Sequence, residues 1–334
     1  MRNWIFLIGF WLGMQTSFAQ NPDWQEIQTP VKASLRGLSP VSDRVCWASG
    51  SEGTWLKTID GGKSWTHGVI DGLDTVDFRS IHAFDDQVAV TASAGQPAVI
   101  YLTDNGGTTW KKVHQEGKQA FFDAIAFVDR KRGYVLGDPV DGKWMILETL
   151  DGGKSWKSLA FLPEAVDGEA AFAASSSSLI SKSDELILGT GGSVSNLHFY
   201  SFSKAKWAKV PATSMIQGEP SQGIFALTES KEGLVLVGGD YLNPKVSEGN
   251  LLKYSKGQFS KPDATTDGYR SGVAFLKDQN LLVAVGPESS DFSKDGGRTW
   301  HQFSKAGFHA VKCGLDQKSL WASGSQGRIG RLME

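Results

Sequence analysis

Cysteine is almost absent from this sequence, in which Cys46 and Cys313 are the only two among 334 residues. Two cysteines are too few for a metal knuckle or a disulfide framework. One bridge between them is compatible with an oxidising compartment, but we favour two small, buried free thiols. The cysteine count therefore predicts neither a metal centre nor a fold stapled by disulfides.

An excess of charge of one sign is also missing. The sequence has 34 Lys and Arg against 36 Asp and Glu, a formal net charge of −2, whereas a nucleic-acid-binding domain needs a basic surface. Its six histidines are scattered without the paired spacing of metal ligands, and no Gly-x-Gly-x-x-Gly fingerprint joins a strand to a helix. We therefore predict no nucleic-acid partner, no metal and no cofactor, and we disfavour a metal or redox enzyme.

Long apolar runs are confined to the start of the chain. Residues 5–14 (IFLIGFWLGM) follow the basic Arg2 and precede the small residue Ala19. The run is too short to span a bilayer comfortably, and the pattern is that of a secretory signal peptide cleaved after Ala19. A retained membrane anchor is the alternative. We therefore predict a signal peptide over 1–19 and an exported domain over 20–334, periplasmic or extracellular, without a further membrane span.

Glycine and tryptophan are abundant, with 39 and 12 residues, and such a composition suggests short strands joined by tight turns. One motif, TIDGGKSW at residues 58–65, returns as TDNGGTTW, TLDGGKSW and SKDGGRTW. The aromatic residues that close the motif, or that stand at its place elsewhere, recur every 41 to 52 residues: Trp24, Trp65, Trp110, Trp156, Trp207, Phe259 and Trp300. Each interval holds four short strand-like segments, which is the size of one propeller blade.

The number of units predicts the architecture. Six units carry all four segments, a seventh beginning at Phe308 has three, and the segment around Trp24 has the fourth without the others. An N-terminal strand that completes the last blade would remove an exposed sheet edge. We therefore predict an all-β fold: a single seven-bladed β-propeller of four-stranded blades, whose ring is closed by the N-terminal strand.

The Asp-Gly-Gly motif is better explained as a turn than as a reaction centre. The carboxylate of Asp60 can accept hydrogen bonds from the turn backbone, the following glycines tolerate positive φ angles, and Trp65 buries a large ring. The same roles are assigned to three further pairs: Asp104 and Trp110, Asp151 and Trp156, and Asp295 and Trp300. The pattern resembles the Asp-box, or bacterial neuraminidase repeat, which lies between the third and fourth strands of a blade and away from the active site. Catalysis and calcium binding by these aspartates are therefore disfavoured.

Candidate functional residues stand where each innermost strand begins, because a propeller builds its ligand-binding face there. These positions hold Arg36, Arg79, Asp123, Glu169, Gln222, Arg270 and His309. Loops after the second strands add Asp138, Asp141, Asp240 and Tyr241, with Glu288 and Asp291 as weaker candidates. A solvated channel rim is the alternative to a binding site.

Two chemical interpretations of this charged cluster remain open. The arginines Arg36, Arg79 and Arg270 would clamp a carboxylate or a phosphate bidentately. Asp123 and Glu169 would be either the acid pair of a glycosidase or counter-ions of the arginines.

Residues 24–332 resemble the photosystem II stability/assembly factor-like propellers in the blade rhythm GYVLGD…TLDGGKSW and in the segments FFDAIAF, GDPVDGK, GEAAFAAS, GGDY and GYRSG. They look most like the exported branch from non-photosynthetic bacteria, which is often labelled oxidoreductase or glycosyl-hydrolase-like. The resemblance implies the propeller fold and an exported location, and hardly any particular activity.

Two functional hypotheses follow, and the sequence leaves open whether the protein is an enzyme. The first is a monomeric binding or assembly scaffold that docks a protein or an anionic glycan through its charged face. The alternative is a glycoside hydrolase of sialidase-like chemistry, in which the three arginines hold a carboxylate. Tyr269 or Tyr241 would then be the nucleophile, and Asp123 or Glu169 the acid/base. Sialidases have six blades and an Arg-Ile-Pro start, whereas this chain predicts seven blades and reads LRGL at 35–38.

Overall fold

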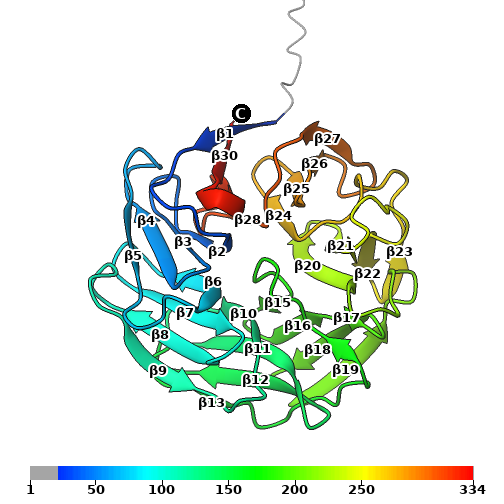
Figure 1. The fold of residues 1–334 in the computed structure, drawn as a ribbon. Coiled ribbons are helices and arrows are strands. Elements are labelled where there is room, and N and C mark those ends of the chain that lie inside the picture. Colours follow the sequence, from blue (N-terminus) through cyan, green and yellow to red (C-terminus); the bar gives the residue numbers. More distant parts are fainter. Residues whose placement is uncertain (1–21, 334) are drawn as a thin grey trace, which may run out of the picture.

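The computed structural model describes residues 22–333. These residues form seven antiparallel sheets arranged as blades around a central axis (Figure 1), so the predicted all-β, seven-bladed propeller is confirmed. The one helical element in this range is a 3-10 turn, η1 (Ser325–Gly327). The predicted signal peptide, residues 1–19, lies outside the described residues. Between residues 22 and 333, no helix is long and apolar enough to cross a membrane.

Each blade runs from an innermost strand beside the axis to an exposed outermost strand. The first three blades comprise β2 (Leu35–Pro40), β3 (Cys46–Gly50), β4 (Thr54–Thr58) and β5 (Thr66–Val69); β6 (Asp77–Ala83), β7 (Ala89–Ala94), β8 (Val99–Thr103) and β9 (Lys111–Gln115); and β10 (Phe122–Phe127), β11 (Gly133–Val140), β12 (Lys143–Thr149) and β13 (Lys157–Ser158). The fourth and fifth comprise β15 (Leu179–Ser181), β16 (Glu185–Gly189), β18 (Asn196–Ser201) and β19 (Lys206–Pro211); and β20 (Gln222–Ser230), β21 (Gly233–Asp240), β22 (Leu251–Ser255) and β23 (Gln258–Ser260). The sixth and seventh comprise β24 (Gly272–Leu276), β25 (Leu281–Val285), β26 (Ser290–Ser293) and β27 (His301–Ser304); and β28 (Ala310–Cys313), β29 (Leu320–Ser323), β30 (Ile329–Met333) and β1 (Asp23–Ile27). Two short strands, β14 (Glu169–Ala170) and β17 (Gly191–Gly192), extend the inner edge of the fifth blade.

The N-terminal strand closes the ring, as predicted. β1 pairs antiparallel with β30, with Trp24 opposite Leu332, so segments from both ends of the chain share the seventh blade (Figure 1). The Trp24 side chain is buried, and its Nε1 donates a hydrogen bond to Ser290 Oγ of the sixth blade at 3.0 Å. Its ring also packs on Phe308, with 5.1 Å between the ring centroids. The N-terminal strand β1 therefore completes the seventh blade and also contacts the sixth blade.

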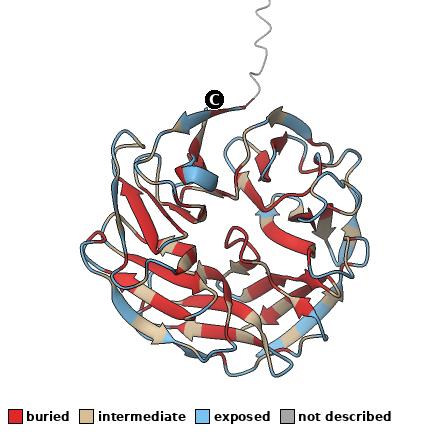
Figure 2. Cartoon of the chain, viewed as in Figure 1, coloured by how far each residue is buried: buried red, intermediate tan, exposed pale blue. Residues whose placement is uncertain are grey.

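Apolar side chains fill the spaces between neighbouring blades. The inner strands are largely buried and the outermost strands are exposed (Figure 2). Between the first two blades, Trp47 and Trp55 pack on Trp110, with ring centroids 6.2 Å and 5.9 Å from it. The two faces of each blade are covered only by the neighbouring blades, so the burial of its apolar side chains depends on an unbroken ring.

The Asp-Gly-Gly turns between third and fourth strands share one hydrogen-bond pattern. In the first turn, Thr58 Oγ1 donates to Asp60 Oδ1 at 2.9 Å, and Ser64 donates to the same carboxylate from its backbone N at 2.9 Å and its Oγ at 2.6 Å. Asp151 and Asp295 accept equivalent bonds in their own turns. These bonds lower the pKa of Asp60 to about 2, chiefly through Ser64. The carboxylates are thus occupied in holding turns.

The second turn corrects one assignment, because the role predicted for Asp104 falls to its neighbour. Asn105 Oδ1 accepts from Thr103 Oγ1 at 3.1 Å and from Thr109 N at 2.9 Å, while Asp104 is exposed. Asn105 stands two residues after its threonine, as Asp60 does, and an amide oxygen accepts hydrogen bonds as a carboxylate oxygen does. The turn thus depends on the spacing from the threonine rather than on the presence of an acid.

The fourth blade departs from the predicted pattern. Glu169 was expected at the start of its innermost strand, but that strand is β15 and Glu169 lies earlier, in β14. Between β14 and β15, residues 171–178, here called the channel segment, enter the centre of the ring, where Figure 1 shows them as a green loop. The Glu169 carboxylate instead contacts Thr190, which follows β16, and Asn196 and His198 in β18.

Hydrogen bonds fix the channel segment to the innermost strands of several blades. Leu227 N of β20 donates to Ser177 O at 2.9 Å, and Ile125 N of β10 donates to Ser176 Oγ at 3.1 Å. Lys312 Nζ of β28 donates to Ser176 O at 3.1 Å. The segment contains mainly alanine and serine, whose small side chains fit where the seven blades converge. It therefore divides the channel into two ends.

Candidate binding site in the propeller channel

Four innermost strands carry a β-bulge near the end at which they begin. A bulge places an extra residue on one strand and redirects its side chain, and bulges are frequent beside active sites. The residues between the shifted pairs are Arg36 in β2, Phe78 and Arg79 in β6, Asp123 in β10 and Phe225 in β20. Arg36, Arg79, Asp123 and Phe225 line one cavity at this end of the channel.

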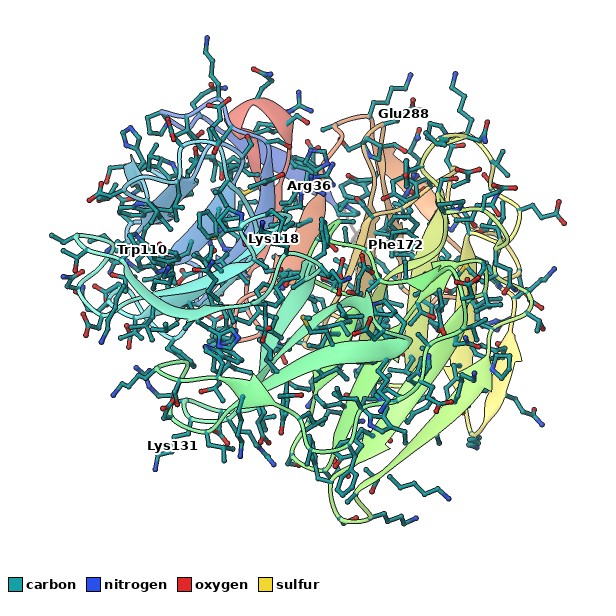
Figure 3. The ribbon with its side chains drawn as sticks, turned by 60° about the horizontal axis from the view of Figure 1, so that its bottom comes forward. Arg36, Trp110, Lys118, Lys131, Phe172 and Glu288 are labelled. Atoms are coloured by element: carbon teal, nitrogen blue, oxygen red, sulfur yellow. The ribbon has the colours of Figure 1, made fainter. Side chains whose placement is uncertain are left out.

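This cavity, here called the arginine cavity, has a volume of about 560 Å³, which is within the range of small-ligand sites. Its titratable residues are Arg36, Arg79, Asp123, Asp138 and His309, and Tyr241 and Tyr269 also line it. Its floor is the start of the channel segment, where Phe172 stacks on Phe225 with 3.7 Å between ring centroids. In Figure 3, Arg36 and Phe172 lie toward the middle of the ring and Trp110 lies at its edge.

The two arginines of this cavity differ in their partners. Arg79 Nε donates to Asp77 Oδ2 at 2.7 Å. Arg36 Nη1 has a longer bond of 3.4 Å to Ala174 O, and among residues 22–333 no carboxylate lies within ion-pair distance of its guanidinium. Burial, and then the nearby Arg79, lower the pKa of Arg36. Arg36 is thus a partly buried cation with no carboxylate of the described chain in direct contact, which favours an anion beside it.

Asp123 is a buried acid without a partner. Its side chain has no exposed surface, and neither carboxyl oxygen has a hydrogen-bond partner. Burial, and then the charge of Asp138, raise the pKa of Asp123 well above its usual value. Burial, followed by Arg36 and Arg79, lowers the pKa of His309 to about 3. At neutral pH the cavity therefore combines a neutral imidazole with two cationic guanidiniums.

The unpartnered Asp123 predicts that an Asp123→Asn variant is more stable than the wild type above neutral pH. The folded protein keeps a proton that the unfolded chain releases, so wild-type stability falls as pH rises from the unfolded pKa toward the raised folded pKa. The stability of Asp123→Asn relative to the wild type should rise by up to about 1.4 kcal/mol per pH unit between the unfolded and folded pKa values of Asp123, so the gain is largest at pH 8 and shrinks toward pH 4. Urea unfolding at both pH values measures it, with Asp141→Asn on the exposed β11–β12 turn as control. A gain that does not change with pH would contradict this assignment.

Comparisons with known proteins find one matching family model and several solved propellers. The family model described as "Photosynthesis system II assembly factor YCF48" matches residues 16–121, a stretch that contains Arg36 and Arg79. Over this stretch, which holds the first two blades, the chain is similar to YCF48. The resemblance to photosystem II assembly-factor propellers is thereby confirmed. No curated protein sequence matches the chain.

Solved structures show the same fold at low sequence identity. "YCF48 bound to D1 peptide" is 17% identical, covers 93% of this chain and 97% of its own, and has a TM-score of 0.67. YCF48 from Cyanidioschyzon merolae is 18% identical, with 92% and 98% covered and a TM-score of 0.67. The structure of U3-55K is 12% identical, with 93% and 98% covered and a TM-score of 0.65. At these identities the likeness shows the fold alone.

Arg270 and Asp240 bond to other groups of the protein and do not line the arginine cavity. Arg270 is buried and paired with Asp291 through its Nε and Nη2 atoms. Asp240 Oδ1 accepts from Leu242 N at 2.9 Å and its Oδ2 accepts from Asn243 Nδ2 at 2.9 Å. The predicted arginine trio is therefore a pair in the cavity, and Asp240 holds the loop that carries Tyr241.

Glu169 also lies outside the arginine cavity. Its Oε1 accepts from Thr190 Oγ1 at 2.6 Å and Asn196 Nδ2 at 2.8 Å, and lies 2.9 Å from His198 Nε2. Burial opposes ionisation, but these hydrogen bonds lower the pKa of Glu169 to about 2. Asp123 and Glu169 thus do not face one another across the cavity as the predicted acid pair. Glu169 is an ionised anchor for the loop before the channel segment.

Sequence reasoning missed the apolar part of the cavity. Phe172 and Phe225 form its aromatic floor, while Pro220, Pro244 and Pro287 line it from loops. Phe172 lies in GEAAFAAS and Phe225 in SQGIF, and neither phenylalanine is among the predicted site residues. A phenylalanine in a run of alanine and serine was the available signal, because such a run has no other apolar side chain of that size to bury.

Proposed function

We propose that the chain is a monomeric binding or assembly scaffold that holds a segment of a partner protein in the arginine cavity. Its decisive feature is Arg36, a partly buried guanidinium that lines the cavity and has no carboxylate within ion-pair distance among the described residues. A ligand carboxylate would pair with Arg36, with Arg79 beside it. Such charge-assisted, bidentate bonds are among the stronger polar contacts available to a protein.

The cavity rim supports a peptide rather than a purely polar ligand. Tyr241 is 47% exposed and Leu242 70% exposed in the loop after β21, next to Pro244. Exposed aromatic and aliphatic side chains around a charged centre are typical of protein-binding surfaces. The structural neighbour solved as YCF48 bound to D1 peptide shows that a propeller of this fold holds a peptide in that protein.

A binding screen with an Arg36→Met variant tests this proposal. Fluorescently labelled acidic peptides of about 12 residues are titrated with wild-type protein, and sulfated glycans form a second arm. We expect peptide binding that weakens at least tenfold, about 1.4 kcal/mol, when Arg36 becomes methionine. Arg44→Met, at the opposite end of the same blade and exposed, should leave it unchanged. Glycan binding without peptide binding would show that the occupant is a glycan instead of a peptide. Equal peptide binding by the wild type and Arg36→Met would reject the arginine cavity as the site.

Glycoside hydrolysis is the second candidate, and Asp123 is the observation that favours it. A buried carboxyl with a raised pKa in a cavity beside two arginines and Tyr269 has the properties of a general acid. Turnover of fluorogenic sialosides and other glycosides, lost in Asp123→Asn, would support it. No turnover across the panel would retire it.

We also propose that the protein is exported through its N-terminal segment. The basic start, the short apolar run and the small residue Ala19 support cleavage there. Mass spectrometry of the protein from the periplasm or medium should give a mature chain beginning at Gln20. A chain retained in the cytoplasm with an intact Met1 would contradict export.

A further inference from the structure

The channel has a second cavity at the end opposite the arginine cavity. In β20, Phe225 lines the first cavity and Leu227, two residues later, lines the second. His309, just before β28, lines the first cavity, and Lys312 in β28 lines the second. The channel segment separates them, since its start lines one cavity and Ser176 lines the other. This second cavity, here called the lysine cavity, also has a volume of about 560 Å³.

The walls of the lysine cavity combine apolar and polar side chains in about equal parts. Four blades contribute the apolar part, with side chains from β15, β20, β24 and β28: Leu179, Ile180, Leu227, Val273, Phe275 and Val311. A concave site with apolar surface and polar groups is the usual form of a small-molecule site. The polar groups therefore decide which ligand class fits.

Lys312 is the cation placed inside this cavity. Its Nζ donates to Ser176 O at 3.1 Å, and among the described residues no carboxylate lies within ion-pair distance of it. Burial lowers the pKa of Lys312 to about 8. An ammonium has three donors, so the bond to Ser176 leaves two for a ligand.

The remaining charges of the cavity are also mainly positive. Lys231 and Lys277 stand exposed at its mouth. The one acidic side chain in its lining is Glu229, whose Oε1 accepts from Lys182 Nζ at 2.9 Å and is thus already paired. A negatively charged ligand would meet attraction at the mouth and an unpaired ammonium inside.

We propose that the lysine cavity is a second ligand site, which binds a small organic anion with an apolar body. Its carboxylate, sulfonate or phosphate group pairs with Lys312 Nζ, and its body lies against Ile180 and Phe275, which are partly exposed apolar side chains of the lining. This site is independent of the peptide site proposed for the arginine cavity, because the channel segment lies between them.

Anilinonaphthalene sulfonate, an apolar anion whose fluorescence rises on binding, is a suitable probe. Titration of the folded, full-length mature protein should show saturable binding that includes a site in the lysine cavity, and Lys312→Met should weaken that site at least tenfold. Lys63→Met, on an exposed turn of the first blade, should leave the affinity unchanged. Equal affinity of the wild type and Lys312→Met would overturn the proposal.

A chemical measurement on the wild type covers the case in which Lys312→Met does not fold. Pyridoxal phosphate, an anionic aldehyde, condenses with a lysine amine with loss of water, and borohydride reduces the resulting imine to a stable secondary amine. Peptide mapping at pH 7.5 should find Lys312 modified ahead of the surface lysines, because its lowered pKa leaves more free amine, and the sulfonate should protect it. Two results would overturn the site: modification of surface lysines while Lys312 stays unmodified, or modification of Lys312 that anilinonaphthalene sulfonate does not reduce.

Discussion

Replacing Asp291 with alanine is expected to lower the free energy of unfolding by about 3–5 kcal/mol, the usual cost of removing one partner of a buried ion pair. Arg270 and Asp291 are 1% and 2% exposed, and two guanidinium nitrogens bond the same carboxylate oxygen. Without Asp291, the Arg270 guanidinium keeps only the neutral acceptors Ser289 Oγ and Tyr269 O, each at 2.8 Å. A buried charge would then remain without a counter-ion.

The Arg270→Met, Asp291→Leu double variant is the matched control for this prediction. Replacing a whole buried pair with apolar residues of similar volume is often neutral or stabilising, so the double variant should regain most of the stability lost by Asp291→Ala. Urea unfolding of the three proteins measures both changes. A loss below about 1 kcal/mol in Asp291→Ala would mean that water reaches Arg270.

Replacing Trp24 with alanine is the second large effect, with an expected loss of about 3–5 kcal/mol, as for other buried tryptophans. Trp24 holds the closing strand β1 against both the sixth and the seventh blades through Ser290 and Phe308. Its removal leaves a cavity and weakens the contact that closes the ring. Hydrogen exchange should therefore rise first in β1 and β30.

Gln25→Ala provides the control for Trp24→Ala, because Gln25 lies on the exposed face of the same strand. The Gln25→Ala substitution should change the free energy of unfolding by no more than about 0.5 kcal/mol. Thermal and urea unfolding compare the two variants. Similar small losses in both would show that the ring does not depend on the Trp24 contact.

The fold could be predicted from the sequence because its signal is repeated. Trp65, Trp156 and Trp300 each precede an outermost strand, and their spacing gives the blade length without any knowledge of contacts. The incomplete last unit and the strand around Trp24 then required a closed ring. The error at Asp104 has a simple cause, since matching by residue type overlooked that Asn105 has the position two residues after the threonine.

The site could be predicted only in part, because it depends on local irregularities. Arg36, Arg79 and Asp123 were recognised as charged residues in apolar strands, and bulges do bring them to one cavity. Arg270 resembled Arg36 and Arg79 in the sequence pattern, but β24 has no bulge and Arg270 pairs with the nearby Asp291. Whether a strand bulges depends on its neighbours, which a single sequence does not show.

Glu169 shows a second limit of the sequence pattern. The spacing placed it on an innermost strand, but the long connection before β15 instead forms β14 and the channel segment. Hydrogen bonds from Thr190 and Asn196 to Glu169 join residues far apart in the chain. The repeat period carries no information about an insertion that occurs in one blade alone.

The most direct test of the peptide site is a double-mutant cycle between Arg36 and the carboxyl groups of a bound peptide. Each carboxyl of the peptide is replaced in turn by an amide, and the Kd is measured with wild-type protein and with Arg36→Met. One replacement should weaken wild-type binding at least tenfold and leave Arg36→Met binding unchanged, because the two changes remove the same ion pair. Replacements that weaken both proteins equally would contradict a carboxylate bound by Arg36.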